Sequence, residues 1–432
     1  MDAEREAVGV VGVGWVGLVT ATCFAELGHP IVALDVNEEK VESLRRGEVT
    51  IHEPGLAELL EKNSERITFT TSMGEVLAAT RILFCCVDTP PTYSGDADLS
   101  RVRSVVAQIP EGSEHALVMK STVPSGTGAS IRRDKPDLRY VSCPEFLKEG
   151  SAIEDFMHPD RVVVGADEGS EEAADAVERL YQPLGGEMVR TDVASAEMIK
   201  LASNAFLATK ISFINEIANV CEQTGADVIE VARGMGLDER IGASFLRAGI
   251  GYGGSCFPKD VSALKQLAGN SGYHFQLLSA VIEVNELQKR RVIAKLEKHL
   301  GSLADKRIAL LGLAFKPDTD DMREASSLVL SARLQGEGAE VVAYDPVAEE
   351  SAASMLPDVE MASSATAALE GADAAVLVTE WPEFSELDWA MVRESMASPV
   401  LIDGRNYLDS DALRAAGFVY DGIGRPDPPD GT

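Results

Sequence analysis

The sequence predicts an α/β protein with a doubly wound parallel sheet near each end and a helical region between them. Three observations favour this class. Short apolar runs alternate with helical stretches in the first part of the chain, a long apolar segment without strand signals follows, and the alternation then returns. A chain of 432 residues is long enough for two or three domains. We therefore expect domains at residues 1–192, 193–300 and 301–432.

The first domain is expected to begin with a strand at residues 7–13, an apolar run typical of a buried parallel strand. Residues 15–27 predict an apolar helix that ends at Gly28, and residues 30–34 predict a second strand that ends at Asp35. Four more strands, with helices between them, are expected at residues 82–87, 116–120, 140–143 and 162–165. This alternation is typical of a parallel sheet with helices on both faces.

The middle domain is expected to be helical. Residues 194–224 predict one long, strongly apolar helix, and further helices are expected at residues 228–235, 261–268 and 277–300. A helix that is apolar along its length needs cover on more than one side. We therefore expect the long helix to span between domains and to form the core of a dimer.

The third domain is expected to return to the α/β pattern, with strands at residues 308–313, 341–345, 374–379 and 400–403. The segments 308–312 and 340–345 resemble the N-terminal pair 8–12 and 31–35, which indicates a diverged second copy of the first fold. The tail at residues 425–432 is rich in Pro, Gly and Asp and is expected to be disordered.

Composition narrows the class of protein. The net charge is −31, with 70 acidic against 39 basic residues, which argues against a nucleic-acid surface because phosphate binding needs a basic stripe. The acids are spread along the chain, as in proteins from salt-loving archaea, although an ordinary acidic enzyme is the alternative. No apolar run reaches the ~18 residues of a membrane span, and the N-terminus lacks the basic start of a signal peptide. A cytoplasmic protein is expected.

A glycine motif at the N-terminus predicts dinucleotide binding. Gly12, Gly14 and Gly17 follow the first expected strand and open the first expected helix, with the spacing that a tight turn and a pyrophosphate require. Asp35 ends the next strand, where a carboxylate accepts a hydrogen bond from the ribose 2′-OH and repels a 2′-phosphate. The sequence therefore predicts a Rossmann domain that prefers NAD to NADP.

One cysteine stands apart from the other five. Cys256 lies in the segment Gly251-Tyr252-Gly253-Gly254-Ser255-Cys256-Phe257-Pro258-Lys259-Asp260, where glycines leave the thiol unshielded and open the backbone to a ligand. Such a loop suits a nucleophilic thiol. Cys23, Cys85, Cys86 and Cys221 have apolar surroundings and are expected to be buried and inert. The cysteines form no CxxC pair and no histidine cluster accompanies them, so no metal site is expected.

Other polar segments allow a functional and a structural interpretation. Lys200 and Asn204 are four residues apart on the long helix, so they share a face and can serve an oxyanion or can be a snorkelling lysine and a satisfied amide. The segments 120–124 and 143–150 end strands at the edge where such sheets bind ligands, but loop and cap chemistry explains them equally. Phe315-Lys316 and Asp403-Gly404-Arg405 can bind phosphate or sugar, or can form surface ion pairs.

Together these segments resemble the UDP-glucose/GDP-mannose dehydrogenase family over residues 8–408. The segment 251–260 is the most specific, and Arg240-Ile241-Gly242 fits the UDP-glucose branch. The resemblance implies an N-terminal Rossmann domain that binds NAD, a helical middle domain that dimerises and carries the cysteine loop, and a C-terminal Rossmann-like domain that binds the nucleotide sugar. Trp15 stands where the family usually has Tyr, and Ala325 where it usually has Ser.

The resemblance further implies a four-electron oxidation of UDP-glucose to UDP-glucuronate with two NAD per turnover and no metal. Cys256 would attack the aldehyde and form a thiohemiacetal and then a thioester. Lys200 would stabilise the alkoxide and later oxyanions, while Asn204 and Asp260 would polarise water, and Asp260 would act as a base. The implied catalytic residues are Cys256, Lys200, Asn204, Asp260, Glu145 and Thr122, the last two orienting water.

Binding roles also follow from the resemblance alone. The residues implied to bind NAD are Gly12, Gly14, Gly17, Asp35, Lys40, Thr89, Thr122, Glu149, Lys259 and Arg323. The residues implied to contact the nucleotide sugar are Glu145, Phe146, Leu147, Lys148, Glu149, Lys200, Asn204, Arg240, Arg247, Tyr252, Gly253, Phe315, Lys316 and Arg405. Arg240 would reach the site of the neighbouring subunit in a homodimer.

Three other functions compete with this interpretation. A GDP-mannose 6-dehydrogenase would use the same chemistry on another nucleotide sugar. A one-hydride β-hydroxyacid dehydrogenase shares a Rossmann and a helical domain, but it needs neither Cys256 nor the third domain. A catalytically silent sensor of nucleotide sugars would not need Lys200, Asn204, Cys256 and Asp260 together.

The acidic balance predicts a requirement for salt. At 1 M salt the Debye length is ~3 Å, so repulsion among the acids is screened. We expect activity and melting temperature to rise together as salt is increased from dilute buffer to molar concentrations. Full activity in dilute buffer with an unchanged melting temperature would contradict this expectation.

Overall fold

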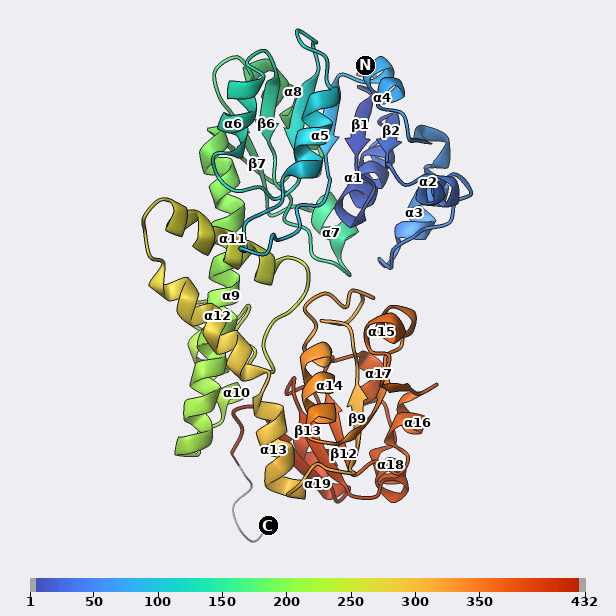
Figure 1. Ribbon diagram of the computed structural model, residues 1–432, viewed down its shortest axis with the longest axis vertical. Coiled ribbons are helices and arrows are strands. Elements are labelled where there is room, and N and C mark those ends of the chain that lie inside the picture. The colour runs from blue at the N-terminus through green and yellow to red at the C-terminus, as the bar shows by residue number, and fades with distance from the viewer. Residues whose placement is uncertain (1–4, 427–432) are drawn as a thin grey trace. The chain divides into compact units, whose positions relative to one another are not determined.

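The computed structural model describes residues 5–426 of the chain (Figure 1). They form two compact units. The first contains the described residues up to Ser203 together with Ser262–Tyr273, and the second contains Asn204–Val261 and the described residues from His274 onward. The division falls within two helices, α9 (Val193–Thr224) and α11 (Phe257–Asn270).

The first unit is built on one eight-stranded sheet with the order β3-β2-β1-β4-β5-β6-β7-β8. Neighbouring strands are parallel, except that β6 and β7 are antiparallel. The strands are β1 (Val8–Val11), β2 (Ile31–Leu34), β3 (Ile67–Thr70), β4 (Ile82–Cys85), β5 (Ala116–Met119), β6 (Arg139–Ser142), β7 (Arg161–Ala166) and β8 (Glu187–Thr191). The chain order reverses between β1 and β4, and ligands bind such sheets beside the carboxyl ends of the strands at this point.

Helices cover both faces of this sheet because its strands are apolar on both sides. Val8 and Val10 of β1 belong to one core with residues of α1 and α8, whereas Val11 belongs to a second core with residues of α4 and α5. The helices of the sheet region are α1 (Trp15–Glu26), α2 (Glu38–Arg45), α3 (Leu56–Lys62), α4 (Met73–Ala79), α5 (Ser100–Gln108), α6 (Thr127–Asp134), α7 (Ala152–Met157) and α8 (Glu171–Tyr181), with short 3-10 turns at Ser64–Arg66 and Gln182–Leu184.

The second unit contains a six-stranded, wholly parallel sheet with the order β11-β10-β9-β12-β13-β14. Its strands are β9 (Arg307–Leu311), β10 (Glu340–Tyr344), β11 (Glu360–Met361), β12 (Ala374–Leu377), β13 (Val400–Asp403) and β14 (Val419–Gly422). Its helices, besides its parts of α9 and α11, are α10 (Val228–Gly236), α12 (Gln276–Gln288), α13 (Arg291–Leu300), α14 (Ser326–Gly336), α15 (Glu349–Met355), α16 (Ala365–Leu369), α17 (Pro382–Ser385), α18 (Trp389–Ser395) and α19 (Ser410–Ala415).

The two sheets begin in the same way. Gly12 and Gly312 both have a positive φ, of 91° and 84°, directly after β1 and β9. Each donates its N–H to the last residue of the neighbouring strand, to Leu34 at 2.7 Å and to Tyr344 at 2.8 Å. This shared geometry agrees with the predicted second copy of the fold.

Two helices differ in extent from the prediction. The expected helix at residues 277–300 is divided into α12 and α13, because Arg290 donates its N–H to Leu287, three residues back, and tightens the turn. The helix expected at residues 261–268 begins earlier, at Phe257, so Pro258 lies in the first turn of α11, where the missing N–H costs nothing.

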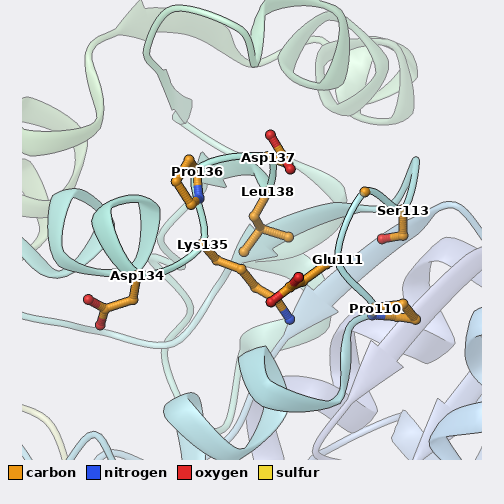
Figure 2. A pocket seen from close by; sticks show the side chains of 9 residues that line it. Pro110, Glu111, Ser113, Asp134, Lys135, Pro136, Asp137 and Leu138 are labelled. Carbon is orange, nitrogen blue, oxygen red and sulfur yellow. The ribbon is translucent and has the colours of Figure 1, made fainter.

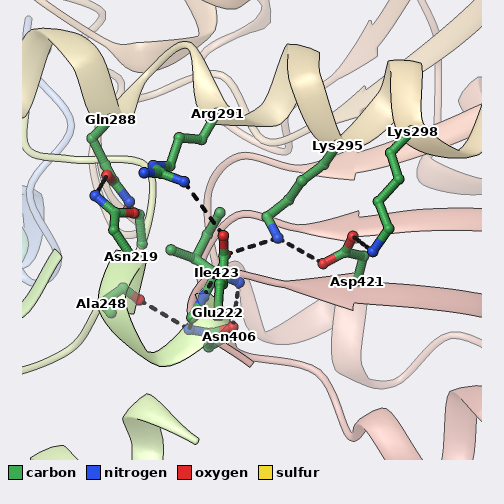
Figure 3. Close-up of polar contacts among 12 residues, drawn as sticks. Asn219, Glu222, Ala248, Gln288, Arg291, Lys295, Lys298, Asn406, Asp421 and Ile423 are labelled. Atoms are coloured by element: carbon green, nitrogen blue, oxygen red, sulfur yellow. Dashed lines mark hydrogen bonds and ion pairs between the residues drawn. The ribbon is translucent and has the colours of Figure 1, made fainter. Parts of the chain in front are cut away.

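A network of charged side chains joins α9, α13 and β14 within the second unit (Figure 3). Lys295 lies 2.8 Å from both Glu222 and Asp421, and Arg291 lies 3.4 Å from Glu222. The Asp421 side chain is only 4 % exposed. Buried carboxylates need such partners because an unpaired buried charge is strongly destabilising.

The structure confirms the predicted fold class, with a largely parallel sheet in the first unit, a wholly parallel sheet in the second and helices between them in the chain. Within residues 5–426, no helix is both long enough and apolar enough to cross a membrane. The predicted disorder of the tail falls, from residue 427 onward, outside the described residues.

Candidate active site

The predicted site residues form two groups, one in each unit. In the first unit, the glycine motif lies between β1 and α1. A Cβ at Gly17 would lie 1.8 Å from the carbonyl oxygen of Gly12, so only glycine fits there. A Cβ at Gly14 would come no closer than 3.8 Å to another atom, that of Asp88. Gly17 therefore serves packing, whereas Gly14 leaves open space at the start of the helix.

This open space suits a dinucleotide. Gly14 is the N-cap residue of α1, no side chain caps the helix, and its first turn carries no acidic residue. Backbone N–H groups and the positive end of the helix dipole therefore face the position that a pyrophosphate takes in this motif. The residues present fit NAD.

Asp35 is the carboxylate that is predicted to accept a hydrogen bond from the ribose of NAD. It follows β2, and its carboxylate accepts hydrogen bonds from the backbone of Val13 at 3.1 Å and of Asn37 at 3.0 Å. Lys40, also predicted to bind NAD, lies 3.3 Å from Asp35. The corresponding Asp345 of the second unit is 2 % exposed and accepts hydrogen bonds from backbone groups and from Trp381.

The loops after β4 and β5 bring two predicted NAD residues together. The Thr89 hydroxyl donates to the backbone oxygen of Thr122 at 2.8 Å. Glu149, in the segment after β6, is buried. Its neighbours Gly150 and Ala152 donate their N–H groups to Glu53 at 2.8 Å, and Trp15 of the glycine motif donates to the same carboxylate at 3.0 Å.

A buried ion pair joins Glu145 and Lys200, with Oε1 and Nζ 2.7 Å apart and both side chains 5 % exposed. Burial raises the pKa of Glu145, but attraction to Lys200 and hydrogen bonds from Lys200 and the Leu147 N–H outweigh burial, so the pKa lies below its usual value. The Lys200 ammonium also lies 5.4 Å from the centre of the Phe146 ring. The structure therefore places an ionised carboxylate against a cation at the carboxyl end of β6.

The rest of this segment is more exposed. Lys148 pairs with Asp155 at 3.0 Å, and its side chain is 62 % exposed. Leu147 donates its N–H to Glu145 at 2.6 Å. Arg161 stacks on the Phe146 ring, 3.9 Å from its centre. The Phe146 ring thus contacts two cationic side chains, those of Lys200 and Arg161.

In the second unit, Cys256 directly precedes α11, and its carbonyl accepts the first helical hydrogen bond, from the Asp260 N–H at 2.9 Å. The thiol therefore lies at the positive end of a 14-residue helix, a position that stabilises negative charge. The Ser255 hydroxyl lies 3.5 Å from the sulfur.

The other cysteines have the opposite environment. All five are buried, whereas Cys256 is half-buried. Burial raises the pKa of Cys23 to about 12 and that of Cys85 to about 11. Burial also raises the pKa of the thiols of Cys86, Cys143 and Cys221. The predicted burial of Cys23, Cys85, Cys86 and Cys221 is confirmed.

The glycines before Cys256 are required by packing. A Cβ at Gly253 would lie 2.3 Å from the Glu324 carbonyl oxygen, and one at Gly254 would lie 2.7 Å from the Phe315 ring. Asn285 of α12 holds the preceding Tyr252, accepting from its N–H at 2.8 Å and donating to its carbonyl at 3.0 Å. The neighbours of the loop in the second unit therefore restrict its shape.

Asn204, Asp260 and Lys259 form a connected group. Asn204 donates its amide N–H to Asp260 Oδ2 at 2.6 Å, and Lys259 donates to Asp260 Oδ1 at 2.5 Å. The Asp260 side chain is 1 % exposed, while that of Lys259 is 19 % exposed. Two of the predicted catalytic residues are thus hydrogen-bonded to each other.

Arg405 holds backbone segments of the second unit together. Its guanidinium donates to the carbonyls of Val378 at 2.7 Å, Gly251 at 3.1 Å and Phe315 at 3.4 Å. Burial lowers the pKa of Arg405 despite the nearby carboxylate of Glu380. Arg405 thus anchors both the cysteine loop and Phe315, another predicted substrate residue.

The remaining predicted binding residues are on more open surfaces. Arg247 lies 3.6 Å from Glu380, with its side chain 54 % exposed. Lys316 lies over the ring of Phe315. Arg240 and Arg323 pair with Asp238 and Asp321, and their side chains are 89 % and 58 % exposed.

A small surface cavity in the first unit is lined by none of the predicted site residues (Figure 2). It has a volume of about 160 Å³ and is lined by residues 110–113, which precede β5, and residues 134–138, which precede β6. The cavity is therefore at the amino ends of the strands, opposite the edge where such sheets bind ligands. Among the described residues, no group of His, Cys, Asp and Glu is arranged to hold a metal ion.

Some residues that organise the two groups carry no local signal in the sequence. Glu53, Asn285 and Glu197 are buried polar residues that bond to backbone groups far along the chain. Glu197 is the exception, because it is a charged residue in the apolar stretch of the long helix.

Comparison with known proteins identifies the family. Three models of the UDP-glucose/GDP-mannose dehydrogenase family match the chain: the NAD binding domain at residues 6–185, the central domain at residues 194–287 and the UDP binding domain at residues 309–410.

Similar proteins match over nearly the whole chain. The UDP-glucose 6-dehydrogenase TuaD of Bacillus subtilis is 48 % identical, over 97 % of this chain and 93 % of its own. A UDP-glucose 6-dehydrogenase of Pseudomonas aeruginosa is 46 % identical, over 96 % of this chain and 97 % of its own. The structure of a UDP-glucose dehydrogenase from Pyrobaculum islandicum superposes with a TM-score of 0.90 at 38 % identity, covering 98 % of this chain and 99 % of that one. The chain belongs to the UDP-glucose/GDP-mannose dehydrogenase family.

Proposed function

We propose that the chain is an NAD-dependent UDP-glucose 6-dehydrogenase that oxidises UDP-glucose to UDP-glucuronate through a thioester on Cys256. One observation carries the covalent step: among six cysteines, five are buried, and the half-buried sixth lies at the N-terminus of α11. The UDP binding domain model and the names of the similar proteins support the substrate.

Bound NAD supplies the acceptor for both hydrides. In the proposed reaction, the C6 alcohol loses a hydride and a proton and becomes an aldehyde. The Cys256 thiolate then adds to the aldehyde carbon, and the oxygen takes a proton to give a thiohemiacetal. Loss of the second hydride and the hydroxyl proton leaves a thioester, which water hydrolyses to the carboxylate with return of the thiol. The covalent adduct prevents escape of the aldehyde.

We assign Lys200 to stabilise negative charge on the substrate oxygen, because a buried cation acts strongly on developing charge. Its pairing with Glu145 at 2.7 Å lowers the pKa of Glu145 and keeps that carboxylate ionised. A carboxylate can then accept a proton from water, and we assign Glu145 to thioester hydrolysis together with Thr122. We assign Asn204 and Asp260 to polarise water, and we assign Lys259 to bind the cofactor.

We also propose that the chain has three domains, which divide after residues 192 and 300. Each turnover would use two NAD. Glycine-motif residues, Asp35, Lys40, Thr89 and Thr122 would hold the cofactor in the first domain. Arg247, Phe315, Lys316 and Arg405 would contact the nucleotide sugar in the third.

We also propose a homodimer. Phe206, Phe213 and Val220 are seven residues apart in α9, so they share one face, and they are 64 %, 49 % and 56 % exposed. Such a row of exposed apolar side chains is typical of an interface. Arg240, which the resemblance assigns to the partner's site, is also exposed.

The substrate assignment is tested by supplying UDP-glucose, GDP-mannose or a small β-hydroxyacid with NAD and following NADH. We expect two NADH per UDP-glucose consumed and UDP-glucuronate as the product. Turnover of GDP-mannose alone would favour the other branch of the family, and turnover of none would favour a silent binding protein.

Replacing Cys256 by Ser is expected to reduce formation of the acid by roughly 10³-fold or more, because the hydroxyl is a poor nucleophile at neutral pH. Calorimetry should show NAD and UDP-glucose bound with affinities close to those of the unchanged chain. Two NADH per sugar from the serine variant would rule out the thioester route.

Replacing Asp35 by Ala is expected to weaken the preference for NAD over NADP by about 10- to 100-fold, the usual contribution of a hydrogen bond to a charged group. The change also removes the partner of Lys40, which becomes available to a 2′-phosphate. The kcat/KM ratio for the two cofactors is the measurement, and Asp35→Asn is the control that removes charge while keeping shape. An unchanged ratio in both variants would contradict the role of Asp35.

Replacing Phe213 by Glu is expected to dissociate the dimer, because the change places charge in the middle of the apolar row. Sedimentation at several protein concentrations should give the mass of one chain, while Met391→Glu, at an exposed apolar position on α18, should leave the dimer intact. Equal masses for the two variants would argue against this interface.

A further inference from the structure

The first turns of α9 contain a buried carboxylate that has no place in the proposed chemistry. Glu197 is 2 % exposed. Its Oε2 accepts the N–H of Gly126 at 2.8 Å, and its Oε1 accepts the N–H of Gly128 at 2.8 Å and the hydroxyl of Tyr140 at 3.2 Å. Glu197 therefore satisfies three donors from two other elements of the first unit.

These donors belong to the segments that carry the first group of site residues. Gly126 is four residues beyond Thr122, in the loop between β5 and α6. Tyr140 is in β6, and Glu145 follows the end of that strand. Lys200 lies three residues after Glu197 in α9, almost one helical turn away. One carboxylate thus connects the positions of Thr122, Glu145 and Lys200.

The surroundings leave little freedom for this contact. A Cβ at Gly128 would lie 2.5 Å from the Val193 side chain and 2.6 Å from the Tyr140 ring, so α6, α9 and β6 pack against one another there. The Ser125 hydroxyl donates to the backbone oxygen of Ala194 at 3.0 Å, a second bond between the same loop and α9. Movement of the loop or the helix would break several bonds together.

The charged and titratable groups around Glu197 come from several elements. Tyr140 of β6 bonds to it directly, and Asp167 after β7 and Cys85 of β4 act on Tyr140. Asp167 also accepts the Val193 N–H at the start of α9 at 3.1 Å, and it pairs with Arg132 of α6. Lys200 is engaged by Glu145.

Burial raises the pKa of Glu197 to about 7, despite hydrogen bonds from the backbone of α6 and from Tyr140. The ionised form is the better acceptor for three donors, so these contacts strengthen as the pH rises through this value. The native fold holds the proton more tightly than an unfolded chain does, so the contribution of this group to stability falls as the pH rises from about 4.5, the ordinary value of the carboxyl, to about 7.

We propose that Glu197 is a positioning residue that sets Lys200 and Glu145 in place relative to the loop of Thr122. The inference rests on the proposed function, because it assigns these three residues to the reaction. The Glu197 carboxylate accepts hydrogen bonds from Gly126, Gly128 and Tyr140, and it acts through the site residues that these segments carry.

The test replaces Glu197 by Gln in the full-length chain. The side chain keeps its size, but one oxygen becomes an NH₂ group that faces a backbone N–H. We expect kcat for UDP-glucose to fall by about 10- to 100-fold while KM changes less than about threefold, since small misplacement of reacting groups costs this much. The ratio of kcat for the unchanged chain to that for the variant should rise as the pH increases through the range near neutrality.

Controls separate positioning from loss of structure. Glu26→Gln removes a carboxylate at the end of α1 that bonds to Lys62 and Asn63, and it should leave kcat and the pH profile unchanged. Glu197→Asp restores a carboxylate and should recover part of kcat; it also serves if the Gln variant does not fold. Melting temperatures and NAD affinities are measured for each variant.

Three outcomes would overturn the inference: normal kcat in Glu197→Gln, a loss that only follows the folded fraction, or a loss confined to KM. Failure of the proposed function has a different signature, because the unchanged chain would then not oxidise UDP-glucose at all.

Discussion

Charged side chains buried at the carboxyl ends of parallel strands constrain this protein more than any other feature. Such groups are stable only when they are paired or fully hydrogen-bonded. Lys200 meets Glu145 after β6, and Lys120 after β5 donates to the Tyr181 hydroxyl at 2.8 Å. Asp403 at the end of β13 accepts three backbone N–H groups and the Tyr420 hydroxyl. Each partnership fixes a loop, and these loops carry predicted site residues, among them Thr122, Glu145 and Arg405.

The two sheets show how one motif can keep or lose an open carboxylate. Both begin with a strand, a glycine with positive φ, and a second strand followed by an aspartate. Asp35 keeps part of its carboxylate accessible and is paired with Lys40. Asp345 is enclosed by backbone groups and Trp381, so it holds its own loop. The second sheet therefore retains the shape of the motif, while its aspartate is committed to structure.

The cysteines show how environment selects among identical groups. Burial disfavours the thiolate of five of them, and their pKa values are raised accordingly. Cys256 instead lies at the start of a helix, beside a loop whose glycines are required by Glu324 and Phe315. Glycines in such a loop predict the close approach of a ligand, whereas the nearest neighbours of Gly253 and Gly254 belong to the protein itself. The packing that holds the glycine loop thus also holds the partly exposed Cys256 at the start of the helix.

The sequence by itself determined the fold class and the separate motifs, because strand alternation, the glycine spacing and the Cys256 segment are local patterns. It also identified Lys200 and Asn204 as neighbours on one helix, since helical spacing is regular. Only the tertiary structure decided the partners: Glu145 for Lys200, Asp260 for Asn204, and backbone carbonyls for Arg405. The same holds for Glu53, Asn285 and Glu197, whose bonds reach 33 or more residues along the chain. Pairing of buried polar groups depends on which segments the sheet brings together, and no local pattern specifies that.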